Sequence, residues 1–349
     1  MIYYLVTAKH SYTMESYLET YGRSLQDQVK LVYYEELPYI GEMPLGTYIF
    51  SDLERLSPAQ ITLAAYVWNH LAQVRPSVRQ LNSPRLTMRR FELQKELHRS
   101  GINCFQTIRA SELYAPFRFP VFIREESEHT GSLTDVLHRE QELSSALGRL
   151  LKEGHRLENL LVVEFCDTSD AAGVYRKYSA FVVGGEIVPR HLIFSRSWVL
   201  KTADLGTGEM LQEERDYLEK NPHEAWLRDI FALASVEYGR IDYSFLGDKP
   251  QIWEINTNPM VLMRPKDYAP VHHPGQEYFA RLILPAFEKV NSPQNLARGV
   301  RVLVPQKIRR DLPGEPRTRS IRRFAKNVKN KVLGRPNVGV VTRHSAGEF

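Results

Sequence analysis

The segment 240–260, RIDYSFLGDKPQIWEINTNPM, constrains the fold of this chain more than any other part. It predicts two short strands, 240–246 and 251–256, joined by a tight turn. Residues 247–250, Gly-Asp-Lys-Pro, are the residue types that turns favour. The segment therefore predicts a β-hairpin.

The predicted hairpin brings two carboxylates face to face. Folding it about Asp248 places Asp242 opposite Glu254. Side chains alternate between the faces of a strand, so Arg240 shares a face with Asp242, and Asn256 shares one with Glu254. Facing pairs have β-carbons about 5 Å apart, and two carboxylates that close repel each other. The pattern predicts a bound cation, and hard oxygen ligands suit Mg²⁺ bridged to substrate phosphates. The alternative is an exposed hairpin with solvated acids.

This segment resembles the metal-binding signature of the ATP-grasp superfamily. The D-alanine–D-alanine ligase branch carries a similar Arg-x-Asp hairpin ending in Glu-x-Asn-x-x-Pro, and ribosomal-protein glutamate ligases carry a like metal motif. The resemblance implies that Asp242, Glu254 and Asn256 hold Mg²⁺ on ATP. It also implies that Arg240 lies near the transferred phosphoryl group and is catalytic.

Composition indicates a globular protein of two or three domains. The chain has 349 residues, of which 43% are hydrophobic and 25% charged. Its two cysteines, Cys104 and Cys166, lack metal-binding spacing, which argues against a disulfide framework and favours a reducing compartment. The first ten residues do not look like a signal peptide, and no apolar run approaches the roughly 20 residues that span a bilayer. We expect a cytoplasmic protein.

The positive charge of the chain is concentrated at its C-terminal end. Residues 298–349 carry 14 Lys and Arg against three Asp and Glu, while the remainder carries 32 basic and 38 acidic residues. Because the body is acidic, the high pI does not indicate a specific nucleic-acid enzyme. Residues 321–333 place apolar and cationic side chains on opposite faces of a helix. Such a tail would bind an anionic membrane surface, RNA or an acidic partner. The alternative is a solvated extension.

The sequence predicts an α/β (α+β) fold in three parts. Residues 1–85 combine strands with a helix that starts at Ser57-Pro58, and they resemble the domain that precedes the ATP-grasp module. The expected strands of this part span 2–7, 30–35 and 48–51. We expect the ATP-grasp domain at 86–290, with a lid subdomain at about 115–200. A basic, flexible tail follows at 291–349.

Further phosphate-binding residues follow from the same resemblance. A helix at about 87–99 carries Arg90, and a strand at 120–124 ends in Arg124, where members of the family usually have lysines that contact phosphate. Arginine keeps the charge and can bind phosphate through two nitrogens. Gly131 and Ser132 fit the loop that covers the phosphates. The alternatives are solvated helix charges and an ordinary turn before a helix, 135–152, capped by Thr134.

The resemblance also predicts a nucleotide linker at the end of the strand at 160–165. Val163, Glu164 and Phe165 would line the adenine pocket. Gly184-Gly185 predicts a second hairpin, 174–193. Its Arg176 and Arg190 are candidates to meet phosphate or a carboxylate, with surface charge as the alternative. Lys201 is a further phosphate candidate.

The favoured function is an ATP- and Mg²⁺-dependent carboxylate–amine ligase that forms an amide through an acyl phosphate. Its partners would be small-molecule or peptide carboxylates and amines. Met260 stands where the D-alanine ligase branch has glycine, so a dipeptide-forming acceptor is not carried over. The alternatives are an ATP-grasp kinase that phosphorylates a hydroxyl, and a non-catalytic ATP-binding protein acting through its tail. The sequence leaves the oligomeric state open; ligases of this kind are often dimers, which is an analogy alone.

Overall fold

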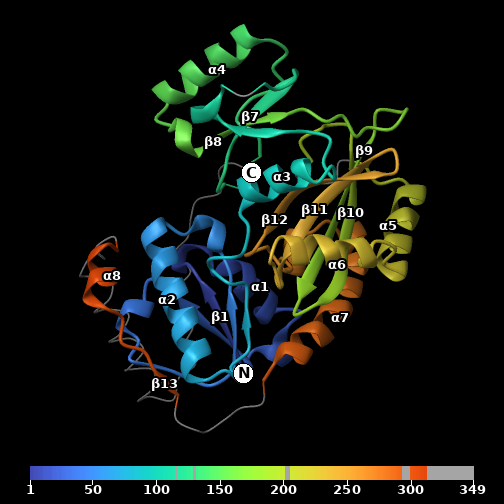
Figure 1. Ribbon diagram of the computed structural model, residues 1–349. Coiled ribbons are helices and arrows are strands. Elements are labelled where there is room, and N and C mark those ends of the chain that lie inside the picture. The colour runs from blue at the N-terminus through green and yellow to red at the C-terminus, as the bar shows by residue number, and fades with distance from the viewer. Residues whose placement is uncertain (115, 129–130, 201–204, 293–298, 313–349) are drawn as a thin grey trace.

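The computed structural model has the mixed α/β architecture that the sequence predicts (Figure 1). It describes residues 1–114, 116–128, 131–200, 205–292 and 299–312. Lys201 and the amphipathic segment 321–333 lie outside the described residues. Within the described parts, no helix is long and apolar enough to cross a membrane.

The N-terminal unit is built on a parallel sheet with the order β2-β1-β4-β5. Every residue of its central strand β1 is buried, as the unbroken apolar run IYYLV predicts for a strand covered on both faces. Ser57 caps α2 as expected: its hydroxyl accepts from the Gln60 N–H, and the Gln60 side chain accepts from the Ser57 N–H. The elements are β1 (Ile2–Val6), α1 (Tyr12–Glu19), β2 (Val29–Tyr33), β4 (Thr47–Phe50), α2 (Pro58–Val74) and β5 (Gln80–Leu81).

Residues 299–312 pack onto this N-terminal unit, which corrects the predicted boundary of the tail at 291. The strands β13 (Val300–Arg301) and β3 (Glu42–Met43) pair, and α8 (Gln306–Arg310) lies beside α2 (Figure 1). Val300, Val302 and Val304 are buried in the unit's core. Here valines alternate with exposed residues, which is typical of a half-buried strand. The prediction missed this pattern because it relied on the charge of the segment.

A small antiparallel unit, with the order β6-β8-β7, stands apart from the rest at the top of Figure 1. It comprises β6 (Thr107–Arg109), β7 (Val121–Glu125), α4 (Glu140–Lys152) and β8 (Leu160–Glu164). The predicted start of its helix at 135 is wrong. Leu137 forms a β-bridge with Val121, and the Thr134 hydroxyl accepts from the Ile123 N–H at 3.1 Å instead of capping a helix.

The large antiparallel sheet has the order β10-β9-β11-β12. Gly184 and Gly185 connect β9 to β10 with φ of 60° and 99°, as the predicted two-residue turn requires. The sheet and its helices are α3 (Arg90–Arg99), β9 (Tyr175–Val183), β10 (Glu186–Ser195), α5 (Gly208–Lys220), α6 (Glu224–Leu233), β11 (Tyr238–Leu246), β12 (Lys249–Asn256) and α7 (His273–Val290).

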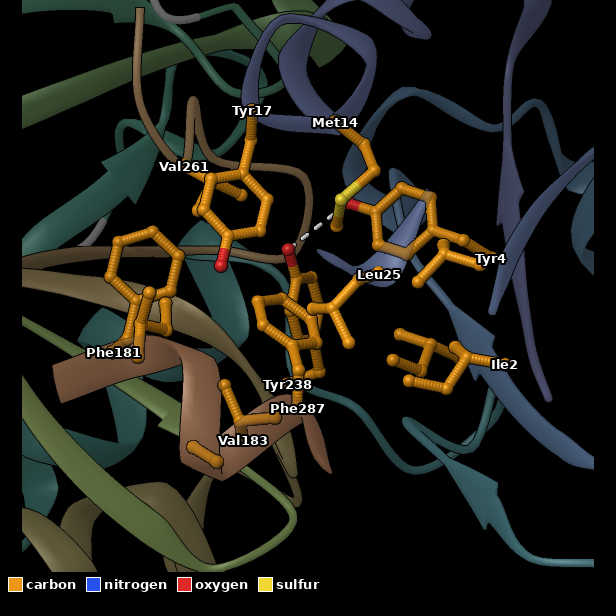
Figure 2. Close-up of a cluster of buried hydrophobic side chains, with 14 of the residues drawn as sticks. Ile2, Tyr4, Met14, Tyr17, Leu25, Phe181, Val183, Tyr238, Val261 and Phe287 are labelled. Carbon is orange, nitrogen blue, oxygen red and sulfur yellow. Dashed lines mark hydrogen bonds between the residues drawn. The ribbon is translucent and has the colours of Figure 1, made fainter. Parts of the chain in front are cut away.

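A shared aromatic core joins the N-terminal unit to the large sheet (Figure 2). Tyr17 of α1 stacks on Phe287 of α7, with ring centroids 5.8 Å apart. The Tyr4 hydroxyl lies 3.3 Å from that of Tyr238 and donates to Asn258 Oδ1 at 2.8 Å. Because Asn258 follows β12 directly, this contact holds the end of the hairpin against the N-terminal sheet.

The two cysteines come together in the fold. Their Sγ atoms lie 3.3 Å apart, and both thiols are free. Burial raises the pKa of the Cys166 thiol, and Cys104 raises it further. A raised thiol pKa lowers the fraction of reactive thiolate at neutral pH.

Val302→Ala tests whether residues 299–304 are part of the folded unit. The Val302 side chain is 2% exposed, so truncation should lower the free energy of unfolding by about 1–3 kcal/mol. Urea denaturation of the full chain measures this change. Leu303→Ala is the matched control, because Leu303 is 65% exposed and should change stability little. Equal effects of the two substitutions would contradict the packing described.

Candidate active site

The two acids of the hairpin face each other as predicted, but the turn and the strand register differ from the prediction. Asp242 lies opposite Glu254, and Arg240 lies opposite Asn256. The turn, however, has two residues and not four, because Leu246 already pairs with Lys249. The register then shifts by one residue beyond Tyr243.

Trp253 is the extra residue of this β-bulge. Tyr243 pairs with Ile252, and Asp242 pairs with Glu254, so Trp253 has no partner of its own on β11. A one-residue slip turns every following side chain to the other face of a strand. The bulge therefore puts Glu254, and not Trp253, opposite Asp242.

Contacts with α3 and the chain after it hold the bulge in place. The Gln94 side chain donates to the Trp253 carbonyl at 2.6 Å. The Asn103 amide both donates to and accepts from the backbone of Ile252, at 2.9 and 2.8 Å. The Trp253 ring stacks on Phe105 with centroids 5.2 Å apart. These contacts to the backbone of Ile252 and Trp253 and to the Trp253 ring hold the bulge in position.

Asp242 is buried among donors from two strands. Its Oδ1 accepts from the Ser179 hydroxyl at 2.6 Å and from Arg240 Nε at 2.9 Å. Lys177 Nζ lies 3.6 Å from its other carboxylate oxygen. Ser179 and Lys177 are both on β9, the strand next to β11. Lys177 was missed from the sequence, although it shares a strand face with Ser179.

Glu254 joins the hairpin to the small unit through two arginines. Its carboxylate forms ion pairs with Arg90, the first residue of α3, and with Arg124 Nη2 at 3.2 Å. Arg90 also donates to the carbonyls of Glu125 and Glu128, at 3.1 and 2.9 Å. Burial lowers the pKa of Arg124 to about 10, and the charge of Arg90 contributes, while Glu254 opposes the shift.

The chemistry of this cluster fits a magnesium–phosphate group. Two carboxylates meet four cationic side chains, which leaves positive charge in excess. The four are Arg90, Arg124, Lys177 and Arg240. Asn256 adds an amide oxygen, which accepts from the Asn258 N–H at 2.8 Å. Among the described residues, no three His, Cys, Asp or Glu gather to hold a metal by themselves, so Mg²⁺ here would also need phosphate oxygens.

Two residues of the predicted phosphate loop, Gly131 and Ser132, belong to the small unit. Gly131 has a φ of 98°, which favours glycine. The Ser132 hydroxyl lies within hydrogen-bonding distance of two carbonyls of its own unit, those of Thr134 at 2.5 Å and Ile123 at 3.1 Å. Its donor is therefore engaged inside the small unit.

Side-chain contacts fix the residues of the predicted nucleotide linker, Val163, Glu164 and Phe165. Val163 is buried, and Phe165 packs edge-on against Trp198, with centroids 5.5 Å apart. Trp198 was not among the site residues predicted from the sequence. It stands there only as an aromatic residue in the stretch after the second hairpin. The Glu164 carboxylate accepts from Arg118 Nη2 at 2.8 Å. Burial would raise the pKa of Glu164, but the hydrogen bonds with Arg118 outweigh it and hold the pKa below its usual value.

Arg176 lies outside the cluster. It pairs with Asp170 at 2.6 Å and with Glu213 at 3.0 Å on the face of β9 opposite to that of Lys177. Side chains alternate along a strand, so Lys177 and Arg176 lie on opposite faces of β9, and it is Lys177 that faces Asp242.

Comparisons with known proteins give distant structural similarity. No family model matches the chain, and no curated protein matches it. A D-alanine–D-alanine ligase from Bacillus anthracis is similar at 14% identity and a TM-score of 0.44, over 82% of this chain and 98% of that one. A RimK domain protein ATP-grasp from Sphaerobacter thermophilus is similar at 12% identity and a TM-score of 0.46, over 81% of this chain and 100% of that one.

Glu254→Gln tests the buried ion pairs of this site. It leaves two largely buried guanidinium groups without their carboxylate, so the free energy of unfolding should fall by about 3–5 kcal/mol. Glu213→Gln removes the partner of a more exposed arginine and should cost only about 0–1 kcal/mol. Denaturant titration of both variants measures the difference. Similar losses would contradict a structural role for the Glu254 pairs.

Proposed function

We propose that this chain is an ATP- and Mg²⁺-dependent carboxylate–amine ligase that works through an acyl phosphate. The observation that supports it best is the convergence on one hairpin of two facing acids and four cations from four elements. This arrangement binds a phosphate chain through charge and holds hard oxygen ligands beside it.

The residues divide into metal ligands and phosphate-binding groups. Asp242, Glu254 and Asn256 would hold Mg²⁺, which when bound offsets negative charge on the ATP phosphates. Arg90 and Arg124 would bind phosphate oxygens from the side of the small unit. Both arginines already meet at Glu254, so they are oriented before any ligand arrives.

In the proposed reaction, an oxygen of the acid attacks the γ-phosphorus of ATP, and the bond to the bridging oxygen of ADP breaks. An amine nitrogen then attacks the acyl carbon; phosphate leaves, and the nitrogen loses a proton. Arg240 would stabilise the charge on the phosphoryl group as it transfers, and Asp242 holds its guanidinium in place through two hydrogen bonds. Lys177 would supply a second positive charge on the same side.

The nucleotide site is tested by two neighbouring cations on opposite faces of β9. Lys177→Met should weaken binding of a non-hydrolysable ATP analogue with Mg²⁺ by at least about tenfold, or 1.4 kcal/mol, because it removes a cation 3.6 Å from Asp242. Arg176→Gln is the matched control and should bind as the wild type does. Titration calorimetry with and without Mg²⁺ measures both. Binding that does not depend on Mg²⁺, or on Lys177, would contradict the proposed site.

Product analysis separates the proposed ligase from a kinase. With ATP, Mg²⁺ and mixtures of acids and amines, mass spectrometry should find an amide together with ADP and phosphate. A phosphate ester with no amide would identify a kinase and overturn the ligase assignment. Asp242→Asn should abolish turnover in either case, because it removes a ligand charge from the metal.

A further inference from the structure

A cavity lies next to the proposed phosphoryl-transfer site. Its volume is about 410 Å³, within the range of small-molecule sites, and Arg240 forms part of its wall. It is bounded by β10, α5 and α7, and by the segment that follows β12. Most of the side chains that line it are apolar, among them Leu192, Phe194, Met210, Leu211, Met260 and Met263.

A second β-bulge brings two polar side chains to this cavity. Pro189 pairs with Ala180, and His191 pairs with Ser179, so Arg190 is an extra residue in β10. In a regular strand, neighbouring side chains point to opposite faces. Arg190 and His191 both line the cavity, as do the next three residues of β10, and the bulge alters the direction of the strand at Arg190.

Arg190 is buried without an anionic partner. Its side chain is 5% exposed, and Nη2 donates to Gln276 Oε1 at 2.7 Å and to the Tyr268 hydroxyl at 3.1 Å. Within the described parts of the chain, Nε and Nη1 have no hydrogen-bond partner, and neither does His191 Nε2. No carboxylate of the described residues forms an ion pair with Arg190. A buried guanidinium without a counter-ion is costly, so a functional reason for it is expected.

Arg190 and Arg240 are close enough to affect each other. Burial is the main cause that lowers the pKa of Arg190, and the positive charge of Arg240 lowers it further, while Tyr268 and the nearby carboxylate of Glu214 oppose the shift. Arg240 forms an ion pair with Asp242, whereas Arg190 forms none with any carboxylate of the described residues. An anion beside both arginines would relieve the repulsion.

We propose that this cavity binds the acid substrate of the ligase, a monocarboxylic acid with an apolar body, whose carboxylate lies between Arg190 and Arg240. The inference rests on the function proposed above. The apolar body would lie among the methionine and leucine side chains of the wall. Two acidic side chains, Glu214 of α5 and Asp267, also line the cavity, so a single negative charge suits it better than a multiply charged acid.

The test compares acids with their uncharged amides on the full-length protein. Hexanoate, 4-methylpentanoate and 3-phenylpropionate are titrated by calorimetry at millimolar concentration, each against its own amide. At least one acid should bind, and its amide should bind at least about tenfold more weakly. Arg190→Gln should weaken acid binding by at least about tenfold. Arg176→Gln removes a half-exposed arginine of the same sheet and should leave it unchanged.

A second variant leaves the buried arginine in place, in case Arg190→Gln does not fold. Ala269 is exposed and lines the cavity, so Ala269→Trp should fill its mouth and block acid binding while the protein stays folded. The proposal is overturned if no acid in the set binds, if the amides bind as well as the acids, or if both variants bind acid like the wild type.

Binding of the Mg²⁺–ATP analogue to the same samples separates the two proposals. Nucleotide binding without acid binding overturns the cavity assignment alone. Acid binding that depends on Arg190, in a protein that binds no nucleotide, supports the carboxylate site and overturns the ligase function. Arg190→Gln should retain nucleotide binding, because Arg190 makes no contact with Asp242 or Glu254.

Discussion

The pairing of Glu254 with Asp242 is the constraint on which the rest of the site depends, and one extra residue sets it. With a two-residue turn, regular pairing would place Trp253 opposite Asp242 and turn Glu254 to the other face. The bulge reverses this for every residue that follows, so the ion pairs of Glu254 and the packing of Asn258 against Tyr4 both depend on it. The aromatic stacking of Trp253 on Phe105 contributes to holding the bulge in position.

Buried charge then connects parts of the chain that are far apart in sequence. Glu254 meets one arginine from the start of α3 and another from β7, so the small unit and the large sheet share a single set of ion pairs. Removing one member of such a set leaves a buried charge without its counter-ion, so the three side chains must keep their relative positions. Arg240 extends the network in the other direction, because it contacts Asp242 and also borders the cavity beside Arg190. The proposed nucleotide and acid sites therefore meet at one side chain.

Local chemistry accounts for the elements that the sequence predicted well. Gly184-Gly185 allowed the turn between β9 and β10 to be placed, because two successive residues with positive φ favour glycine. Ser57 and Pro58 located the start of α2 by the same kind of local argument. Predictions failed where a long-range contact competed with the local signal: the bridge of Leu137 to Val121 displaced the start of α4. The buried valines of 300–304 were missed because they lie within the strongly basic segment 298–349, which the charge count assigned to the tail.

By itself, the sequence determined that a hairpin forms here and that its side chains alternate between two faces, because strand periodicity and turn residues are local properties. The meeting of Asp242 and Glu254 was predicted with a four-residue turn, whereas in the structure the bulge at Trp253 sets it. Only the tertiary structure decided which cations complete the site. The faces of β9 could be separated from the sequence, but the pairing of β9 with β11 decided that Lys177 and not Arg176 reaches Asp242. The bulge that brings Arg190 to a cavity likewise has no local signature, because it exists only in the register between two strands.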